Sequence, residues 1–221
     1  MPKIGVVLSG CGVQDGSEIH EATLLLLALD RRGAEAVCFA PDKPQADVVD
    51  HATGKPADET REILAESARI ARGAIRPLQD ARPEDLDALI LPGGFGAAKN
   101  LCTFAREGAD CGVDIELRRL LERLHLAGKP IGAACIAPVI LARVFGSEKP
   151  VLTIGSDPAT AKAIETLGAR HQACAATEVV VDRECRFATT PAYMLARRIS
   201  EVADGMDRLV QEVLELTRVP A

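Results

Sequence analysis

The sequence predicts an α/β protein with a doubly wound, mostly parallel sheet and helices on both faces. The chain opens with a strand–helix–strand order, and further short apolar runs are followed by glycine-rich loops. Helical stretches with apolar residues at i, i+3 and i+4 separate these runs. The 221 residues, without repeats or low-complexity tracts, favour a single domain spanning residues 1–221.

The first elements show this order directly. KIGVVL (3–8) is an apolar run of strand length, followed by the glycine-rich loop SGCGVQDG. Segment 17–33 is rich in helix formers, and Gly33 supplies its stop signal. AEAVCFA (34–40) is expected to be a second buried strand. Together they predict the start of a parallel sheet.

The middle of the chain repeats the pattern after a polar interval. Segment 41–83 is polar, holds one helical stretch near 58–72, and is predicted to be a surface insertion. LDALILPGGFG (86–96) is a strand that runs into a second glycine-rich loop. A helix is expected over 113–128, and PIGAAC (130–135) is expected to be the next strand.

The last third carries weaker signals. A helix is predicted over 136–145, directly after the strand that ends at residue 135. Strands are predicted at 151–154, 178–181 and 186–189, followed by a long C-terminal helix over 192–216.

Composition argues against several classes of partner. A net charge of −6 disfavours nucleic acids and anionic membranes, because both require basic surfaces. Aromatic residues make up only 3% of the chain, which leaves little material for base stacking. The longest apolar run, 24–29, is too short to span a membrane, and MPKIGVVLSG lacks a signal-peptide core. A cytoplasmic location is therefore expected.

The cysteines indicate reduced thiols. Seven cysteines form no CxxC pair, which fits neither a disulfide framework nor a zinc ribbon. His171 and Cys174 have i, i+3 spacing, but no second pair completes a tetrahedral site. No metal site is expected.

Cys135 is the first candidate for chemistry. Small residues surround it in GAACIA, as a sharp strand-to-helix turn with a nucleophile at its centre requires. The start of the following helix is expected to stabilise a thiolate and lower the thiol pKa. The segment by itself fits a buried, unreactive cysteine equally well.

Two further strand ends carry unusual residues, and ligands bind at the carboxyl ends of such strands. The amides of the PGGFG loop are predicted to form an oxyanion hole with the amide of Ile136. This loop lacks a phosphate-binding GxxxxGK, and the first loop misses GxGxxG because Asp15 follows in place of the third glycine. No cofactor is expected.

The first predicted helix supplies the carboxylates. Asp15 and Glu18 match a capping box, which gives Glu18 a structural explanation. Glu21 lies one turn further and has no capping role, so its carboxyl group is free to face the strand ends. Buried there, it is expected to have a raised pKa and to carry a proton or bond a thiolate. His20 is expected to point elsewhere.

These segments together resemble a known superfamily. LPGGFGAAKNL, GAACIAPVILA and the Glu-bearing first helix are similar to class I glutamine-amidotransferase-like proteins, in the branch of the PfpI proteases and the parkinsonism-associated deglycase. SGCGVQDGSEIHEA and ATTPAYMLA narrow the resemblance to ElbB-like proteins, described as isoprenoid-biosynthesis proteins or as a glyoxalase. It covers residues 3–216. It implies a flavodoxin-like sheet, homodimers and a pocket for small carbonyl compounds.

The resemblance assigns roles to residues of this chain. It implies Cys135 as nucleophile, Glu21 as the catalytic carboxyl, and the Gly94 and Ile136 amides as the oxyanion hole. Further supporting residues are Glu18, Cys11, Gly93 and Asn100.

The chain departs from the superfamily in its histidines. Ile136 follows Cys135 where related enzymes place a histidine, and VLTIGSD contains none downstream. His171 would have to be brought to the site by folding, and His51 and His125 have the character of surface positions. A hydrolytic triad is therefore not predicted.

Two functions follow as expectations. The first is a cofactor-independent glyoxalase, in which the Cys135 thiolate attacks glyoxal or methylglyoxal and Glu21 moves protons to give glycolate or lactate. The second is a redox sensor or scaffold in which Cys135 is oxidised, with Cys11 as the resolving thiol. A third hypothesis is an amidase or amidotransferase, which would need the histidine that this chain lacks next to Cys135.

Overall fold

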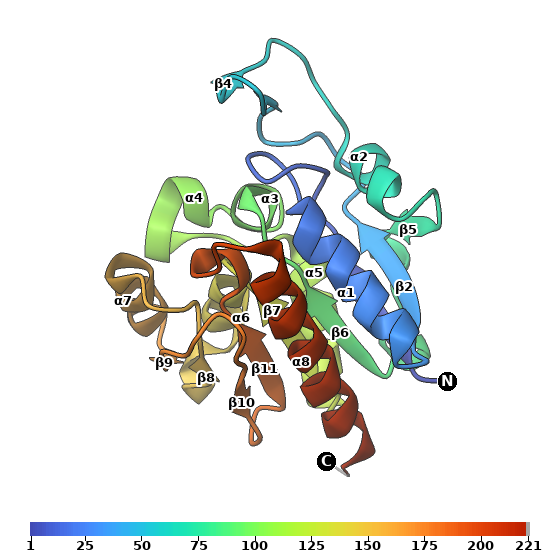
Figure 1. Ribbon diagram of the computed structural model, residues 1–221, viewed down its shortest axis with the longest axis vertical. Helices are drawn as coiled ribbons and strands as arrows, with labels where there is room; N and C mark the ends of the chain where they lie inside the picture. Colours follow the sequence, from blue (N-terminus) through green and yellow to red (C-terminus); the bar gives the residue numbers. More distant parts are fainter. Residues whose placement is uncertain (220–221) are drawn as a thin grey trace.

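The structure is a computed structural model that describes residues 1–219 (Figure 1). Seven strands form the central sheet: β1 (Lys3–Val7), β2 (Glu35–Ala40), β5 (Ile75–Pro77), β6 (Ala88–Leu91), β7 (Ile131–Ala134), β10 (Val180–Asp182) and β11 (Phe187–Thr190). Their order is β10-β11-β7-β6-β1-β2-β5, and every neighbouring pair except β10–β11 is parallel. The predicted α/β fold class is confirmed.

Two small sheets lie outside the central one. They pair β3 (Val49–Asp50) with β4 (Lys55–Pro56) antiparallel, and β8 (Val151–Leu152) with β9 (Arg170–His171) in parallel. The helices are α1 (Ile19–Arg31), α2 (Ile63–Ile70), α3 (Phe95–Lys99), α4 (Phe104–Glu107), α5 (Ile115–Leu126), α6 (Pro138–Phe145), α7 (Pro158–Thr166) and α8 (Ile199–Arg218). Short 3-10 turns cover Leu78–Asp80, Pro83–Asp85, Gly108–Asp110, Gly146–Glu148 and Ala192–Met194.

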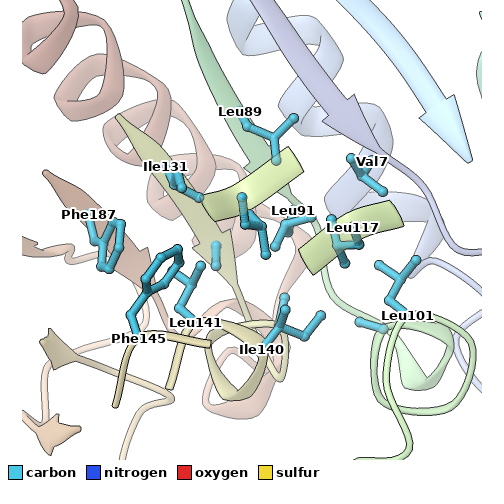
Figure 2. Close-up of a cluster of buried hydrophobic side chains, with 14 of the residues drawn as sticks. Val7, Leu89, Leu91, Leu101, Leu117, Ile131, Ile140, Leu141, Phe145 and Phe187 are labelled. Atoms are coloured by element: carbon cyan, nitrogen blue, oxygen red, sulfur yellow. The ribbon is translucent and has the colours of Figure 1, made fainter. Parts of the chain in front are cut away.

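Helices cover both faces of the sheet. Helices α1 and α8 lie side by side on one face, whereas α5 and α6 cover the other (Figure 1). Alternate residues of each strand pack against the helices on opposite faces of the sheet, because successive side chains of a strand point to opposite faces. Val6 belongs to the cluster under α1 and α8, and its neighbour Val7 belongs to the opposite cluster. Figure 2 shows that second cluster, where Leu89, Leu91 and Ile131 lie near α5 and α6.

The C-terminal helix begins later than the sequence predicts. It starts at Ile199 and not at residue 192, because a 3-10 turn over Ala192–Met194 and an extended residue before Ile199 precede it. Ala192 has φ of +44°, and Arg198 is extended. The carboxylate of Glu201 accepts hydrogen bonds from the amides of Arg197 and Arg198, which caps the helix at its observed start.

Other predicted elements shift for physical reasons. The run near 151–154 forms only β8, which pairs outside the central sheet, and helix α7 is not predicted because its sequence buries only Ile164. Segment 41–83 contributes the edge strand β5 to the central sheet, although the sequence predicts a surface insertion there. No helix within residues 1–219 is both long enough and apolar enough to cross a lipid bilayer.

Candidate active site

Cys135 occupies a strained turn between β7 and α6. Its φ of +59° lies in the left-handed region that residues with a Cβ rarely adopt. The Cys135 amide donates to the Thr190 carbonyl at 3.0 Å, which fixes the turn to the neighbouring strand β11. Ala134 and Ala137, the small residues on either side, are fully buried. The predicted strand–turn–helix geometry is therefore present, with the cysteine at its centre.

Glu21 is brought to the same point from the first turn of α1. Its side chain is fully buried, and its two carboxylate oxygens each accept a backbone hydrogen bond. Gly93 donates to Oε2 at 2.8 Å, and Tyr193 donates to Oε1 at 3.2 Å. The Cys135 sulfur and Glu21 Oε2 both lie against Gly93, since a Cβ on that residue would be 3.0 Å from the sulfur and 2.7 Å from the oxygen. Residues from α1, β6, β7 and β11 thus meet at the carboxyl ends of the central strands.

Burial raises the pKa of Glu21 from 4.5 to about 7. The negative charge of Glu18 also raises this pKa, while the amides of Tyr193 and Gly93 and the thiol of Cys135 lower it. A carboxyl group with this pKa exchanges a proton readily near neutral pH, which is the property a general acid–base needs.

The pKa of Cys135 differs from the sequence expectation. Burial and then the charge of Glu21 raise it well above the usual value for a thiol, although the amides of Gly94 and Ile136 oppose this. The expected lowering by the helix start is outweighed because the thiol is only 8% exposed and faces a second acidic group. Cys135 is therefore a thiol at rest, with Glu21 as its neighbouring proton acceptor.

Gly93 and Gly94 allow this close packing. A Cβ on Gly93 would lie 2.4 Å from the Cys135 Cβ and 2.7 Å from Glu21 Oε2. Gly94 has φ of +94°, and a Cβ there would lie 2.3 Å from the Glu18 amide nitrogen. The backbone of the PGGFG loop therefore touches both reactive side chains as only glycine permits.

A cavity of about 340 Å³ opens above Cys135. Its eleven lining residues are uncharged: Val13, Gly94, Phe95, Ala98, Phe104, Ala105, Cys135, Ile136, Thr160, Tyr193 and Met194. A small, largely apolar pocket over a nucleophile suits a small neutral substrate.

The supporting residues named from the sequence divide into two groups. Gly93 and Glu18 belong to the site, but Glu18 itself caps α1 by accepting from the Glu21 amide at 2.7 Å. The expected capping box is absent, because Asp15 instead accepts from the amide of Val49. Asn100 bonds the backbones of Ser9, Asp15 and Ala46, which gives it a structural role.

Cys11 is not brought to Cys135. Cys11 follows β1, and β6 separates β1 from β7 in the central sheet. Burial raises the pKa of the Cys11 thiol, and the charges of Glu66, Arg69, Asp15 and Arg61 also act on it. Glu66 and Arg69 lie on α2, which packs against α1, β2 and β5. The geometry offers no support for Cys11 as a resolving thiol.

The histidines are placed as follows. His171 lies on β9, outside the cavity lining; His51 is exposed; and half-buried His125 pairs with Glu148 at 2.9 Å. His20 differs from its expected orientation, because its Nδ1 lies 2.7 Å from the hydroxyl of Tyr193, a lining residue. Tyr193 is the residue that sequence reasoning missed. Its signal was its place three residues beyond the end of β11.

The described residues contain no convergent metal ligands. Within residues 1–219, no group of three His, Cys, Asp or Glu side chains is arranged to hold a metal ion. The site is built from one thiol, one carboxyl group and backbone amides.

A strained cysteine beside a buried glutamate, at the carboxyl ends of the strands, is the arrangement expected of a class I amidotransferase-like protein. No family model matches the chain. A human protein named glutamine amidotransferase-like class 1 domain-containing protein 3, mitochondrial, is 48% identical over 97% of this chain and 83% of its own length. The chain therefore belongs to the ElbB-like family of the class I amidotransferase-like superfamily.

Solved structures agree with this assignment. An isoprenoid biosynthesis protein with amidotransferase-like domain from Ehrlichia chaffeensis has a TM-score of 0.91 and 35% identity, covering 98% of this chain and 99% of that one. Glyoxalase III from Candida albicans, with a TM-score of 0.63 and 13% identity over 97% of each chain, shares the fold. The expectation of a cytoplasmic protein is wrong, since the curated relatives carry mitochondrial names.

The pKa of Glu21 predicts how folding stability depends on pH. Because the folded-state pKa is raised from 4.5 to about 7, this group's contribution is fully present below pH 4.5 and is lost as pH rises through 7. The loss amounts to about 3 kcal/mol. Urea unfolding of wild type and Glu21→Gln from pH 4.5 to 8 measures it. The difference in unfolding free energy between the two proteins at each pH isolates the contribution of Glu21. A difference that stays constant with pH would contradict the prediction.

Proposed function

We propose that the protein is a cofactor-independent glyoxalase that acts on glyoxal or methylglyoxal through Cys135. The observation that carries this proposal is the buried, neighbouring Cys135–Glu21 pair, in which the pKa of the carboxyl group is about 7, at the base of an uncharged cavity. A thiol adds readily to an aldehyde, and a base of this pKa can then move a carbon-bound proton.

In the first step, the Glu21 carboxylate takes the thiol proton as sulfur bonds to the aldehyde carbon. The C=O π electrons move to oxygen, and the amides of Gly94 and Ile136 stabilise the negative charge there. Protonation of that oxygen by Glu21 gives the hemithioacetal and restores the carboxylate. Cys135 needs no low pKa for this sequence, because its proton leaves only as the new bond forms.

In the second step, Glu21 removes the remaining hydrogen from the thiol-bearing carbon. The electron pair forms an enediol as the neighbouring carbonyl oxygen is protonated. Glu21 then returns its proton to the second carbon and takes the hydroxyl proton of the first carbon, which gives a thioester. Water then attacks the thioester, releasing glycolate or lactate and the Cys135 thiol. One water is consumed, and there is no net oxidation or reduction.

The cavity favours this reaction over glutamine hydrolysis. Glutamine carries a charged α-amino and α-carboxyl group, and both lose hydration when they are buried without charged partners. None of the eleven residues that line the cavity is charged. A small aldehyde has no such requirement.

The buried thiol also weighs against a redox sensor. Sensor cysteines are exposed and have a low pKa, often beside a resolving thiol. Cys135 is buried and its pKa is raised, and β6 lies between the strand that precedes Cys11 and the strand that precedes Cys135. The alternative function is therefore not favoured.

We also propose a mitochondrial location and a homodimer. The location is supported by the names of the curated relatives. The dimer is supported by large apolar side chains exposed near the cavity, since Val13, Ile19 and Phe95 are 40%, 44% and 53% exposed. Light scattering on the purified protein tests the dimer.

Glyoxal turnover in D2O tests the proposed chemistry. Without added thiol or metal, the protein should convert glyoxal to glycolate that carries one deuterium on its second carbon, because the proton passes through Glu21. Glycolate without deuterium would indicate an internal hydride shift and would contradict the enediol route. No glycolate at all would overturn the proposed function.

A further inference from the structure

One proton in the proposed reaction has no donor among the residues assigned so far. When Glu21 removes hydrogen from the first carbon, the oxygen on the second carbon must be protonated. Only three of the eleven lining side chains carry a polar hydrogen: Cys135, Thr160 and Tyr193. Cys135 is bonded to the substrate, and the Thr160 hydroxyl already donates to Asp157 Oδ2 at 2.7 Å. Tyr193 remains.

Tyr193 contacts both the catalytic carboxyl group and a histidine. Its amide donates to Glu21 Oε1 at 3.2 Å, so its backbone is fixed relative to the reacting groups. Its hydroxyl lies 2.7 Å from His20 Nδ1, with the two ring centroids 5.8 Å apart. His20 is exposed, whereas Tyr193 is half-buried in the cavity wall. The pair therefore links the cavity to solvent.

The surrounding charges keep the tyrosine protonated. Burial raises its pKa, and the negative charges of Glu18 and Glu21, the carboxyl groups of α1 that face it, raise it further. A phenol that stays protonated at neutral pH is available as a hydrogen-bond donor and acid.

We propose that Tyr193 protonates the second carbonyl oxygen of the substrate and that His20 resupplies its proton. This role rests on the proposed glyoxalase function. The Tyr193 O–H proton passes to the substrate oxygen, and the Nδ1–H proton of His20 passes to the tyrosine oxygen. His20 then takes a proton from water at Nε2, which leaves the neutral imidazole in its other tautomer. The proton that Glu21 releases to solvent neutralises the resulting hydroxide, and exchange with water restores the Nδ1–H tautomer. The pair supplies the histidine chemistry that the residue after Cys135 lacks.

The experiment compares Tyr193→Phe and His20→Gln with wild type. Tyr193→Phe keeps the backbone amide that bonds Glu21, and it should lower kcat for glyoxal by about 100-fold with KM within threefold. His20→Gln should lower kcat by about tenfold, and imidazole in the buffer should restore it. Imidazole should not restore Tyr193→Phe, which has lost the acid itself. His125→Gln, far from the cavity, is the control and should match wild type.

The rate of Cys135 alkylation by iodoacetamide separates chemistry from structure. It should stay within twofold of wild type in both variants, because the nucleophile and Glu21 are unchanged. Equal kcat in wild type and Tyr193→Phe would overturn this role alone. A change in KM without a change in kcat would show that Tyr193 only lines the cavity, and this result would also overturn its role as a proton donor. No turnover by wild type would overturn the glyoxalase function itself and this role with it.

Discussion

Cys135→Ser is expected to lower glyoxal turnover by about 1,000-fold or more. The serine hydroxyl would occupy the place of the thiol beside Glu21, so the geometry is retained. A hydroxyl is a far weaker acid than a thiol, and a carboxyl group whose pKa is about 7 cannot take its proton effectively. Steady-state assays of glycolate formation measure the loss.

Cys174→Ser is the matched control for this substitution. Cys174 is half-buried, its sulfur lies 3.7 Å from the Thr153 hydroxyl, and it does not line the cavity. This variant should retain turnover within about twofold of wild type. If Cys135→Ser keeps a tenth of the wild-type rate, the reaction does not depend on a cysteine nucleophile.

Gly93→Ala is expected to damage both stability and activity. The added methyl group would lie 2.4 Å from the Cys135 Cβ and 2.7 Å from Glu21 Oε2, neither of which can move freely in a buried site. Crowding of this kind costs about 1–3 kcal/mol of unfolding free energy. Displacing the reactive groups by about 1 Å should also lower kcat by roughly 100-fold. Urea unfolding and glyoxal turnover measure the two effects.

Gly112→Ala provides the comparison. A Cβ at this position would meet its nearest neighbour, the Thr103 hydroxyl, only at 4.0 Å. Its unfolding free energy and turnover should stay near wild type. Equal behaviour of the two alanine variants would show that the space around Gly93 is not critical.

The fold was largely predictable because its strands are buried on both faces. Such strands are continuous apolar runs, as in KIGVVL and LDALIL, and Gly33 and Gly128 mark the helix ends by adopting positive φ values. Helix α7 could not be predicted from a pattern of apolar residues, because it buries only one side chain, that of Ile164. The start of α8 was missed because Ala192, a good helix former, adopts a positive φ, and the Tyr193 amide is held by the Glu21 carboxylate.

The sequence allowed us to predict which two side chains meet in the candidate site, but not the direction in which the pKa of Cys135 shifts. Cys135 and Glu21 follow from the rule that functional residues gather at strand ends. The direction of the Cys135 pKa depends on depth of burial and on a carboxyl group from a distant helix, which local sequence does not encode. Tyr193 was missed for a similar reason, because its partners Glu21 and His20 lie on the first helix, near the opposite end of the chain.

The residues that line the cavity come from other parts of the fold than the reacting groups beneath it. The positions of Cys135 and Gly93 are set by the ends of β7 and β6, and that of Glu21 by the first turn of α1. Val13 and Phe104, by contrast, lie in the loop after β1 and at the start of the short helix α4, both outside the central sheet. Substrate choice and chemistry can therefore diverge independently during evolution. Descendants of one ancestral scaffold can keep the same thiol and carboxyl group while they change the molecules they accept.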